Sequence, residues 1–186
     1  YGLSRNGVKE AAGSGITLII TVDCGITSVN EVEYAKSLGV DVIITDHHEP
    51  DKELPDAYAI IDPKRTDCTY PFKHLAGVGV AFKLIQGILL RNEMPLKITS
   101  EFLDIATIGT AADIVPLTGE NRKIVSDGLK YLENCKNIGI SSLLSKLNLF
   151  QKKIKVSNIL FGLAPRLNAV GRMGDANRAV RLLLSN

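Results

Sequence analysis

The chain has 186 residues, 45% of them hydrophobic, and its 22 Lys and Arg against 20 Asp and Glu give a net charge of +2. This length and composition allow one sizeable core, with room for a smaller second lobe. The small net charge neither requires nor excludes a nucleic-acid partner, because a local basic patch matters more than the total. No apolar run reaches the roughly 20 residues of a membrane span.

Three cysteines, Cys24, Cys68 and Cys135, are scattered along the chain and form no CxxC pair. An odd, scattered set fits a reducing compartment better than a disulfide framework. We therefore expect a soluble, cytoplasmic protein that does not contact a membrane. The chain starts without Met and stops inside an apolar run, so we also expect it to be part of something longer.

Two apolar, β-branched segments, residues 17–22 and 40–45, flank a stretch with the signals of a helix. Ser28 and Glu31 have the spacing of a capping box, in which each side chain accepts a hydrogen bond from a free backbone N–H at the helix start. Gly39 supplies the left-handed residue that commonly closes a helix. Strand, helix and strand in about 30 residues form a βαβ unit, whose helical crossover makes the strands parallel.

Ionisable side chains come directly after both predicted strands: Asp23 follows the first, and Asp46, His47 and His48 follow the second. Because ligands bind at the carboxyl ends of strands in an open parallel sheet, we expect these side chains at one edge. Carboxylate favours Mg²⁺ or Mn²⁺, and imidazole shifts the preference toward Mn²⁺ or Zn²⁺. Adjacent residues of an extended segment point in opposite directions, so only one histidine should bind an ion while the other faces substrate.

Simpler interpretations exist for these residues. Asp before Gly is ordinary turn chemistry, so Asp23 is also consistent with a turn or with the phosphate-accepting Asp of a receiver domain. Asp46, His47 and His48 are harder to explain as a solvated strand end. Three ionisable groups directly after four apolar residues cannot all be buried without partners, because unpaired charge in the interior is costly.

A third strand is expected at residues 57–61, which are apolar and are stopped by Asp62 and Pro63. Asp62 would then lie near the same sheet edge. The predicted fold is α/β: an open parallel sheet with βαβ units in residues 1–65, followed by a mainly helical half in residues 66–186 packed over the sheet edge. The helices are predicted at 75–90, 100–111, 121–132, 141–147, 157–163 and 175–184.

Asp113 follows a run of small residues at the end of the helix predicted over 100–111, and Pro116 prevents that helix from continuing. Asp113 solvated at a helix end is the simpler interpretation. However, a carboxylate at a helix C-terminus opposes the helix dipole and is mildly unfavourable unless a cation lies nearby. This conflict favours Asp113 as a further metal ligand.

Two glycine-containing segments are candidates for phosphate binding. Residues 165–174 combine Arg166, Arg172 and two glycines with the amide of Asn168, and the planar fork of arginine suits phosphate. Arginines solvated in a turn are the competing interpretation. Gly77, with a second glycine two residues later, opens the helix predicted over 75–90 and resembles a phosphate-binding loop only weakly. Such glycines more often serve close packing.

Taken together and in this order, the motifs resemble those of the DHH phosphoesterase superfamily. Residues 23–25, 46–48 and 109–113 resemble its second, third and fourth motifs. Residues 167–172 look like the arginine motif of one branch, the RecJ single-strand-specific exonucleases. Residues 1–4 and 75–84 also look like this branch, so the resemblance runs nearly from end to end.

The resemblance implies a hydrolase that uses two Mn²⁺ or Mg²⁺ ions. By motif position, it implies that Asp23 bridges the two ions and that His47 and Asp113 ligate one of them. His48 would approach the scissile phosphate, and Asp46 would orient its neighbours.

The implied activity is a 5′-to-3′ exonuclease on single-stranded DNA, in DNA repair and recombination. Arg172, with Asn168 and Arg166, would bind the substrate phosphate. A single-strand-binding protein or a helicase is a further expected partner.

The sequence departs from the family in two places. The first motif, a strand that ends in closely spaced aspartates, and a C-terminal DHHA1-type domain have no counterpart in the 186 residues. We therefore expect an incomplete catalytic core, with weak or no metal binding and little activity in isolation. The alternatives are another DHH phosphoesterase, acting on short oligonucleotides, cyclic dinucleotides or pyrophosphate, and a non-catalytic DHH relative serving as a replication scaffold.

Overall fold

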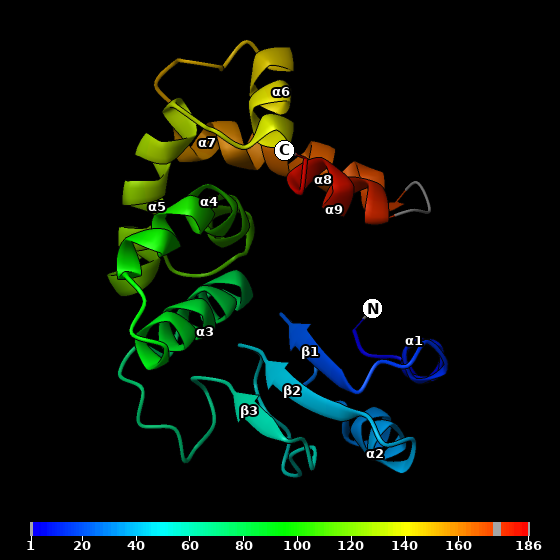
Figure 1. Ribbon diagram of the computed structural model, residues 1–186. Helices are drawn as coiled ribbons and strands as arrows, with labels where there is room; N and C mark the ends of the chain where they lie inside the picture. The colour runs from blue at the N-terminus through cyan, green and yellow to red at the C-terminus, as the bar shows by residue number, and fades with distance from the viewer. Residues whose placement is uncertain (1, 173–175, 186) are drawn as a thin grey trace. The chain divides into compact units, whose positions relative to one another are not determined.

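The computed structural model describes residues 2–172 and 176–185 of the chain. It divides into two compact units, Tyr1–Arg91 and Asn92–Asn186, whose helices and strands are drawn in Figure 1. Each unit has its own buried apolar cluster. Every strand in the described residues belongs to the first unit, whereas the second is helical. The predicted α/β class with an open parallel sheet is confirmed.

The first unit contains one sheet in the strand order β1-β2-β3, and both neighbouring pairs are parallel. Val22 at the end of β1 pairs with Thr45, and Thr45 pairs with Ile61 at the end of β3, so the three carboxyl ends meet at one edge. The βαβ unit and the third strand are confirmed. The elements are α1 (Arg5–Gly13), β1 (Leu18–Val22), α2 (Val29–Ser37), β2 (Asp41–Thr45), β3 (Ala59–Ile61) and α3 (Gly77–Arg91).

Apolar packing of α1 and α2 fixes one face of this sheet. Val8 of α1 and Val32 and Ala35 of α2 are buried in one cluster with Val42 and Ile44 of β2. Val42 and Ile44 are two residues apart, so they point to the same face of the strand. The two helices therefore cover the face that this alternation makes apolar.

Helix α2 begins and ends where the sequence predicts, but its start is built differently. Gly39 follows the helix with a left-handed φ of 72°. The predicted capping box is wrong, because Ser28 occupies the N-cap position and its side chain makes no capping hydrogen bond. Ser28 has φ −86° and ψ 51°, outside the extended conformation from which a capping side chain reaches the first turn.

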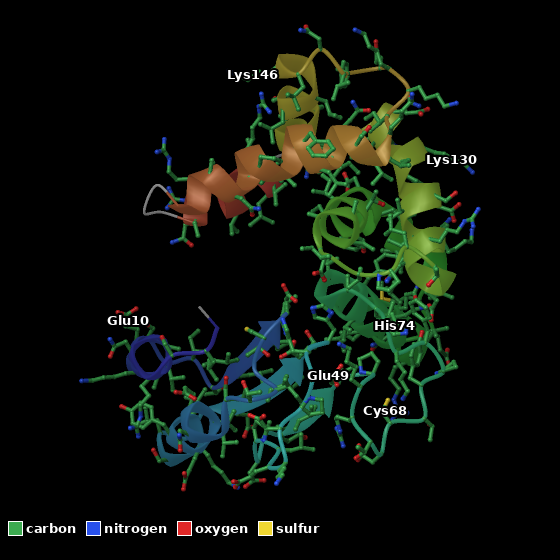
Figure 2. All side chains as sticks on the ribbon, turned by 180° about the vertical axis from the view of Figure 1, so that it is seen from behind. Glu10, Glu49, Cys68, His74, Lys130 and Lys146 are labelled. Carbon is green, nitrogen blue, oxygen red and sulfur yellow. The ribbon has the colours of Figure 1, made fainter. Side chains whose placement is uncertain are left out.

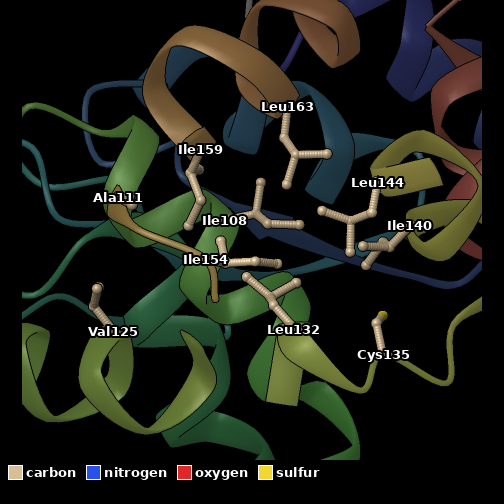
Figure 3. Close-up of a cluster of buried hydrophobic side chains, with 10 residues drawn as sticks. All are labelled: Ile108, Ala111, Val125, Leu132, Cys135, Ile140, Leu144, Ile154, Ile159 and Leu163. Carbon is tan, nitrogen blue, oxygen red and sulfur yellow. The ribbon is translucent and has the colours of Figure 1, made fainter. Parts of the chain in front are cut away.

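The second unit packs its helices around the apolar cluster drawn in Figure 3. The buried side chains come from α4, α5 and α6, from the connection between α5 and α6, from the loop after α6 and from the segment that leads into α8: Ile108, Ala111, Val125, Leu132, Cys135, Ile140, Leu144, Ile154, Ile159 and Leu163. The elements are a 3₁₀ turn (Leu96–Phe102), α4 (Leu103–Ala112), α5 (Gly119–Glu133), α6 (Ile138–Lys146), α7 (Val156–Asn158), a π turn (Ile159–Leu163), α8 (Ala164–Arg172) and α9 (Asn177–Leu183).

The segment around Pro165 is helical rather than a turn. Proline inside an α-helix removes one hydrogen bond and clashes with the carbonyl four residues earlier. Here the π turn at Ile159–Leu163 directly precedes α8 and widens the helix at that carbonyl. The arginine-containing segment therefore begins on a helix, which the interpretation as a solvated turn did not anticipate.

Charge is divided unequally between the units. Residues 1–91 contain nine Lys and Arg against twelve Asp and Glu, a net charge of −3, whereas residues 92–186 contain thirteen against eight, a net charge of +5. Figure 2 shows Glu10 and Glu49 in the first unit and Lys130 and Lys146 on α5 and α6 of the second. Within the described residues, the helices are too short or too polar to cross a bilayer.

Candidate metal centre

Asp23 stands immediately after β1, on a tight backbone turn. Its N–H donates a hydrogen bond to the carbonyl of Thr45 at 3.0 Å, which prolongs the pairing of β1 with β2. Its φ is 63°, in the left-handed region, where Asp is better tolerated than most residues. The Thr21 hydroxyl donates to the carbonyl of Cys24 at 2.7 Å and braces the turn. The Asp23 carboxylate is thus presented by a fixed backbone.

Asp46 is almost fully buried, with 1% of its surface exposed, and its carboxylate organises the loop that follows β2. Oδ2 accepts a hydrogen bond from the N–H of Ile26 at 2.9 Å, which ties the loop to the chain after β1. Oδ1 accepts from the N–H groups of His47 and His48 and lies 2.6 Å from Nδ1 of His48. Burial alone would raise the pKa of Asp46, but these hydrogen bonds together hold that pKa below its ordinary value.

The two histidines lie on the same side as Asp23. Nε2 of His47 is 3.0 Å from Oδ1 of Asp23, and one ligand atom from each of Asp23, His47 and His48 fits within 4.8 Å of the others. The expectation that the histidines point in opposite directions is wrong: their ring centroids are 4.6 Å apart. β2 ends at Thr45, so the alternation of an extended strand does not continue through His47 and His48.

Asp46 also determines which nitrogen of His48 faces outward. An ionised carboxylate can only accept a hydrogen bond, so Nδ1 of His48 is the donor in this contact and Nε2 is the ring nitrogen left for other partners. The side chain of His48 is 51% exposed, compared with 10% for His47. His47 therefore suits a buried ligand position, and His48 presents a basic nitrogen to whatever approaches the sheet edge.

One carboxylate and two imidazoles within 4.8 Å of one another suit a divalent cation such as Mn²⁺, which accepts oxygen and nitrogen ligands. Even if His48 is counted as a ligand, such a set leaves coordination positions for water or substrate. The residues present therefore fit the metal expected from the sequence.

Asp62 is a further buried acid at this edge, which the sequence placed there without a role. It follows β3, is 2% exposed, and its Oδ1 accepts a hydrogen bond from the N–H of Lys64 at 2.8 Å. Its Oδ2 is buried and has no hydrogen-bond partner among the described residues. Burial raises the pKa of Asp62, and the neighbouring Asp46 raises it further. Only the three-dimensional structure reveals this burial, because an acid before proline normally indicates a turn.

The remaining predicted site residues belong to the second unit. Asp113 caps α4: its N–H donates to the carbonyl of Gly109 at 2.9 Å, so the predicted helix end is confirmed. Asn168 lies on α8 and lines a pocket of about 320 Å³ together with Ala112, the last residue of α4. The structure therefore brings the α8 segment close to the end of α4.

The two arginines of this segment differ in what the structure describes. Arg166 lies near the start of α8 and is exposed, and its guanidinium donates to the carbonyl of Gly162 at 3.0 Å. Arg172 is the last residue of α8, and its side chain lies outside the described part of the chain. Phosphate binding by either arginine stays a prediction.

Known proteins are similar in sequence to this chain. The family model described as "DHH family, N-terminal domain" matches residues 3–110. The chain is 50% identical over 185 residues to the single-stranded-DNA-specific exonuclease RecJ of Bacillus subtilis, covering 100% of this chain and 23% of that protein. It is 44% identical to the RecJ of Escherichia coli, covering 99% of this chain and 34% of that protein.

Solved structures of RecJ proteins are also similar to this chain. The crystal structure of RecJ from Thermus thermophilus in complex with Mn²⁺ matches with a TM-score of 0.85 at 35% identity, over 98% of this chain and 27% of that one. A manganese-bound exonuclease RecJ matches with a TM-score of 0.87 at 36% identity, over 100% of this chain and 46% of that one. The chain spans a quarter to a third of the two curated relatives. The resemblance to the RecJ branch is confirmed, and the chain belongs to the DHH family.

Proposed function

We propose that the protein carrying this chain is a metal-dependent phosphodiesterase of the RecJ type, which degrades single-stranded DNA from its 5′ end. The observation that carries the proposal is the cluster of Asp23, His47 and His48 at one sheet edge, in a chain similar along its whole length to proteins named single-stranded-DNA-specific exonucleases. The relatives solved with Mn²⁺ and Mg²⁺ support these ions as the cofactors.

Within this proposal, the five motif positions of the resemblance take separate roles. Asp23 and His47 hold the metal, and the motif resemblance assigns Asp113 as a further ligand. Asp46 is a positioning residue, because it fixes both histidine backbones and the His48 ring through its own oxygens. His48 faces the scissile phosphate with Nε2.

Divalent cations bound at such a site supply a hydroxide at neutral pH and stabilise the attacking and leaving oxygens of an in-line displacement. The chain itself supplies orientation. Asp46 accepts the hydrogen bond from Nδ1 of His48, which leaves Nε2 free to serve the substrate: without a proton it accepts one, and with a proton it donates a hydrogen bond to a phosphate oxygen. No side chain has to form a covalent intermediate. The buried position of His47 keeps one ligand in place when substrate is absent.

Further contacts with the substrate phosphates are proposed for the second unit. Arg172, Arg166 and Asn168 bind the DNA phosphates, consistent with the net charge of +5 on residues 92–186. We infer a role in DNA repair and recombination, in the cytoplasm, with a single-strand-binding protein or a helicase as partner. Because the chain covers only part of its relatives, these properties belong to the complete protein.

The test uses the full-length protein with Mn²⁺ and single-stranded DNA labelled at either end, with duplex DNA, dinucleotides, cyclic dinucleotides and pyrophosphate as competing substrates. We expect progressive release of nucleotides from the 5′ end of single strands. His47→Ala should abolish this release without unfolding the protein, whereas His74→Ala should leave it unchanged, because His74 lies outside the ligand cluster.

Each alternative function predicts a different result. Preferential cleavage of dinucleotides, cyclic dinucleotides or pyrophosphate would identify another DHH phosphoesterase. If the wild-type protein releases no more nucleotide than His47→Ala does, the cluster does no chemistry, and this result would favour the non-catalytic scaffold.

A further inference from the structure

Gly77, the first residue of α3, touches the site that we propose for the metal. A Cβ placed on Gly77 would lie 2.2 Å from Oδ1 of Asp23 and 2.6 Å from both its Cβ and its Cγ. Contacts between carbon and these atoms normally lie at about 3.5 Å or more. Any side chain at position 77 therefore collides with the Asp23 carboxylate as it now stands.

Rotation of the Asp23 side chain cannot relieve this collision. The Cβ of Asp23 is itself only 2.6 Å from the added atom, and the backbone fixes the position of a Cβ. That backbone is held by the hydrogen bond from the Asp23 N–H to the Thr45 carbonyl and by its left-handed φ of 63°. Either the turn after β1 or the start of α3 would have to move.

The crowded oxygen is the one that meets the histidine. Oδ1 of Asp23 is 3.0 Å from Nε2 of His47, and it is also the atom closest to the missing side chain of Gly77. We propose that Gly77 is a positioning residue of the metal centre. Its backbone, which carries no side chain, contacts the Asp23 carboxylate and keeps Oδ1 of Asp23 directed at His47. This inference rests on the proposed metal-binding function of Asp23.

The same helix provides a matched comparison. Gly87 also lies in α3, but a Cβ there would meet nothing within 4 Å. Gly87→Ala therefore makes the same chemical change in the same helix without a collision, and alanine is the better helix former. A general need for glycine in α3 would affect both positions, whereas a positioning role singles out Gly77.

The experiment is a double-mutant cycle in the full-length protein, with Gly77→Ala, Asp23→Gly and the double variant, and Gly87→Ala as control. Two quantities are measured: Mn²⁺ affinity by titration calorimetry, and the thermal midpoint in the absence of metal. Asp23→Gly removes the colliding side chain, and glycine adopts the left-handed φ at position 23 without strain.

We expect Gly77→Ala to weaken Mn²⁺ binding by at least about 10-fold, within the range seen when a residue that orients a metal ligand is lost. Gly87→Ala should leave the affinity unchanged and should not lower the thermal midpoint. Gly77→Ala should lower the midpoint when Asp23 is present and have little effect in the Asp23→Gly background. If Gly77→Ala alone fails to fold, the double variant should fold again, because the collision is gone.

Three results would overturn the inference: wild-type Mn²⁺ affinity in Gly77→Ala, equal loss of thermal midpoint in both backgrounds, or a double variant that fails to fold although Asp23→Gly folds. A failure of the proposed function looks different. In that case His47→Ala would leave Mn²⁺ binding unchanged, or the wild-type protein would not bind the ion at all.

Discussion

The two units use polar side chains in opposite ways. In the first, the buried ionisable groups gather at the strand ends, where Asp46, His47 and Asp62 are all at most 8% exposed. In the described residues of the second, the buried ionisable side chains are Asp104 and the thiol of Cys135. The rest of that interior is apolar, with a few hydroxyl and amide groups. The first unit is net acidic and the second net basic.

This difference follows from topology. Parallel strands joined by a helix must end at the same edge, so each loop that leaves the sheet adds a side chain to one small region. Helices that bury a common stripe have no equivalent edge, and their interior is best filled with aliphatic side chains. The sheet unit can therefore concentrate ligands at a stability cost, while the helical unit gains stability from packing.

The largest loss of stability is expected from a change in the apolar core of the helical unit, outside the ligand cluster. Leu144→Ala removes a fully buried side chain from α6 in the core of the second unit. We expect the free energy of unfolding to fall by about 2–5 kcal/mol, measured by urea denaturation. Ile138→Ala on the same helix, where the side chain is 50% exposed, should cost much less.

Leu144→Ala should leave Mn²⁺ affinity unchanged at temperatures where the variant is folded, because the side chain takes no part in the ligand cluster. A substantial loss of Mn²⁺ binding in the folded Leu144→Ala protein would contradict this division between packing and chemistry.

Asp46→Asn should lower both the free energy of unfolding and the Mn²⁺ affinity. Its effect on the free energy of unfolding should be smaller than that of Leu144→Ala. The amide presents a donor where the carboxylate accepts from the N–H of Ile26 or from His48, which leaves a buried donor without an acceptor. We expect a loss of about 1–3 kcal/mol and an Mn²⁺ affinity reduced by about 10- to 100-fold. Asp56→Asn, at an exposed ion pair with Lys36, is the matched control and should change neither property appreciably.

The lowered pKa of Asp46 also fixes the sign of a pH effect. Because the folded-state pKa is below the ordinary value of 3.8, ionised Asp46 contributes stability above that value, and this contribution is lost as the pH falls through the folded-state pKa. Urea denaturation in metal-free buffer at a series of acidic pH values should therefore show a shallower acid decline in Asp46→Asn than in wild type. An identical decline would mean that Asp46 is not the group responsible.

Much of this arrangement could be predicted from the sequence, because local chemistry and topology agree. Two β-branched runs, a helix between them and Gly39 were enough to make β1 and β2 parallel and to bring Asp23 next to His47 and His48. The helix end at Asp113 followed from Pro116 in the same way.

The errors have a different origin. The loop after Thr45 is not extended, since Asp46 draws the next two N–H groups toward one oxygen, so the histidines point the same way. The burial of Asp62 and the contact of Gly77 with Asp23 depend on segments far apart in the sequence. Such details follow from tertiary packing, which periodicity and spacing do not contain.

The smallest expected losses in the free energy of unfolding come from removing one helix cap in each unit. Asn137 caps α6: its Oδ1 accepts from the N–H of Ile140 at 2.9 Å, and its Nδ2 donates to the carbonyl of Leu183 in α9 at 2.6 Å. Ser4 caps α1 with one exposed hydrogen bond of 3.2 Å, from the N–H of Gly7. Replacing a capping side chain by alanine costs about 0.5–2 kcal/mol.

We therefore expect Asn137→Ala to lie near the upper end of this range and Ser4→Ala near the lower end, by urea denaturation. Asn137→Asp separates the two contributions of Asn137, because aspartate keeps the acceptor for Ile140 and removes the donor to Leu183. A stability between those of wild type and Asn137→Ala would show that the cap also fastens α9 to α6. Equal stability of Asn137→Asp and wild type would assign the whole effect to the cap, and the helical unit would then depend on apolar packing alone to hold its last helix.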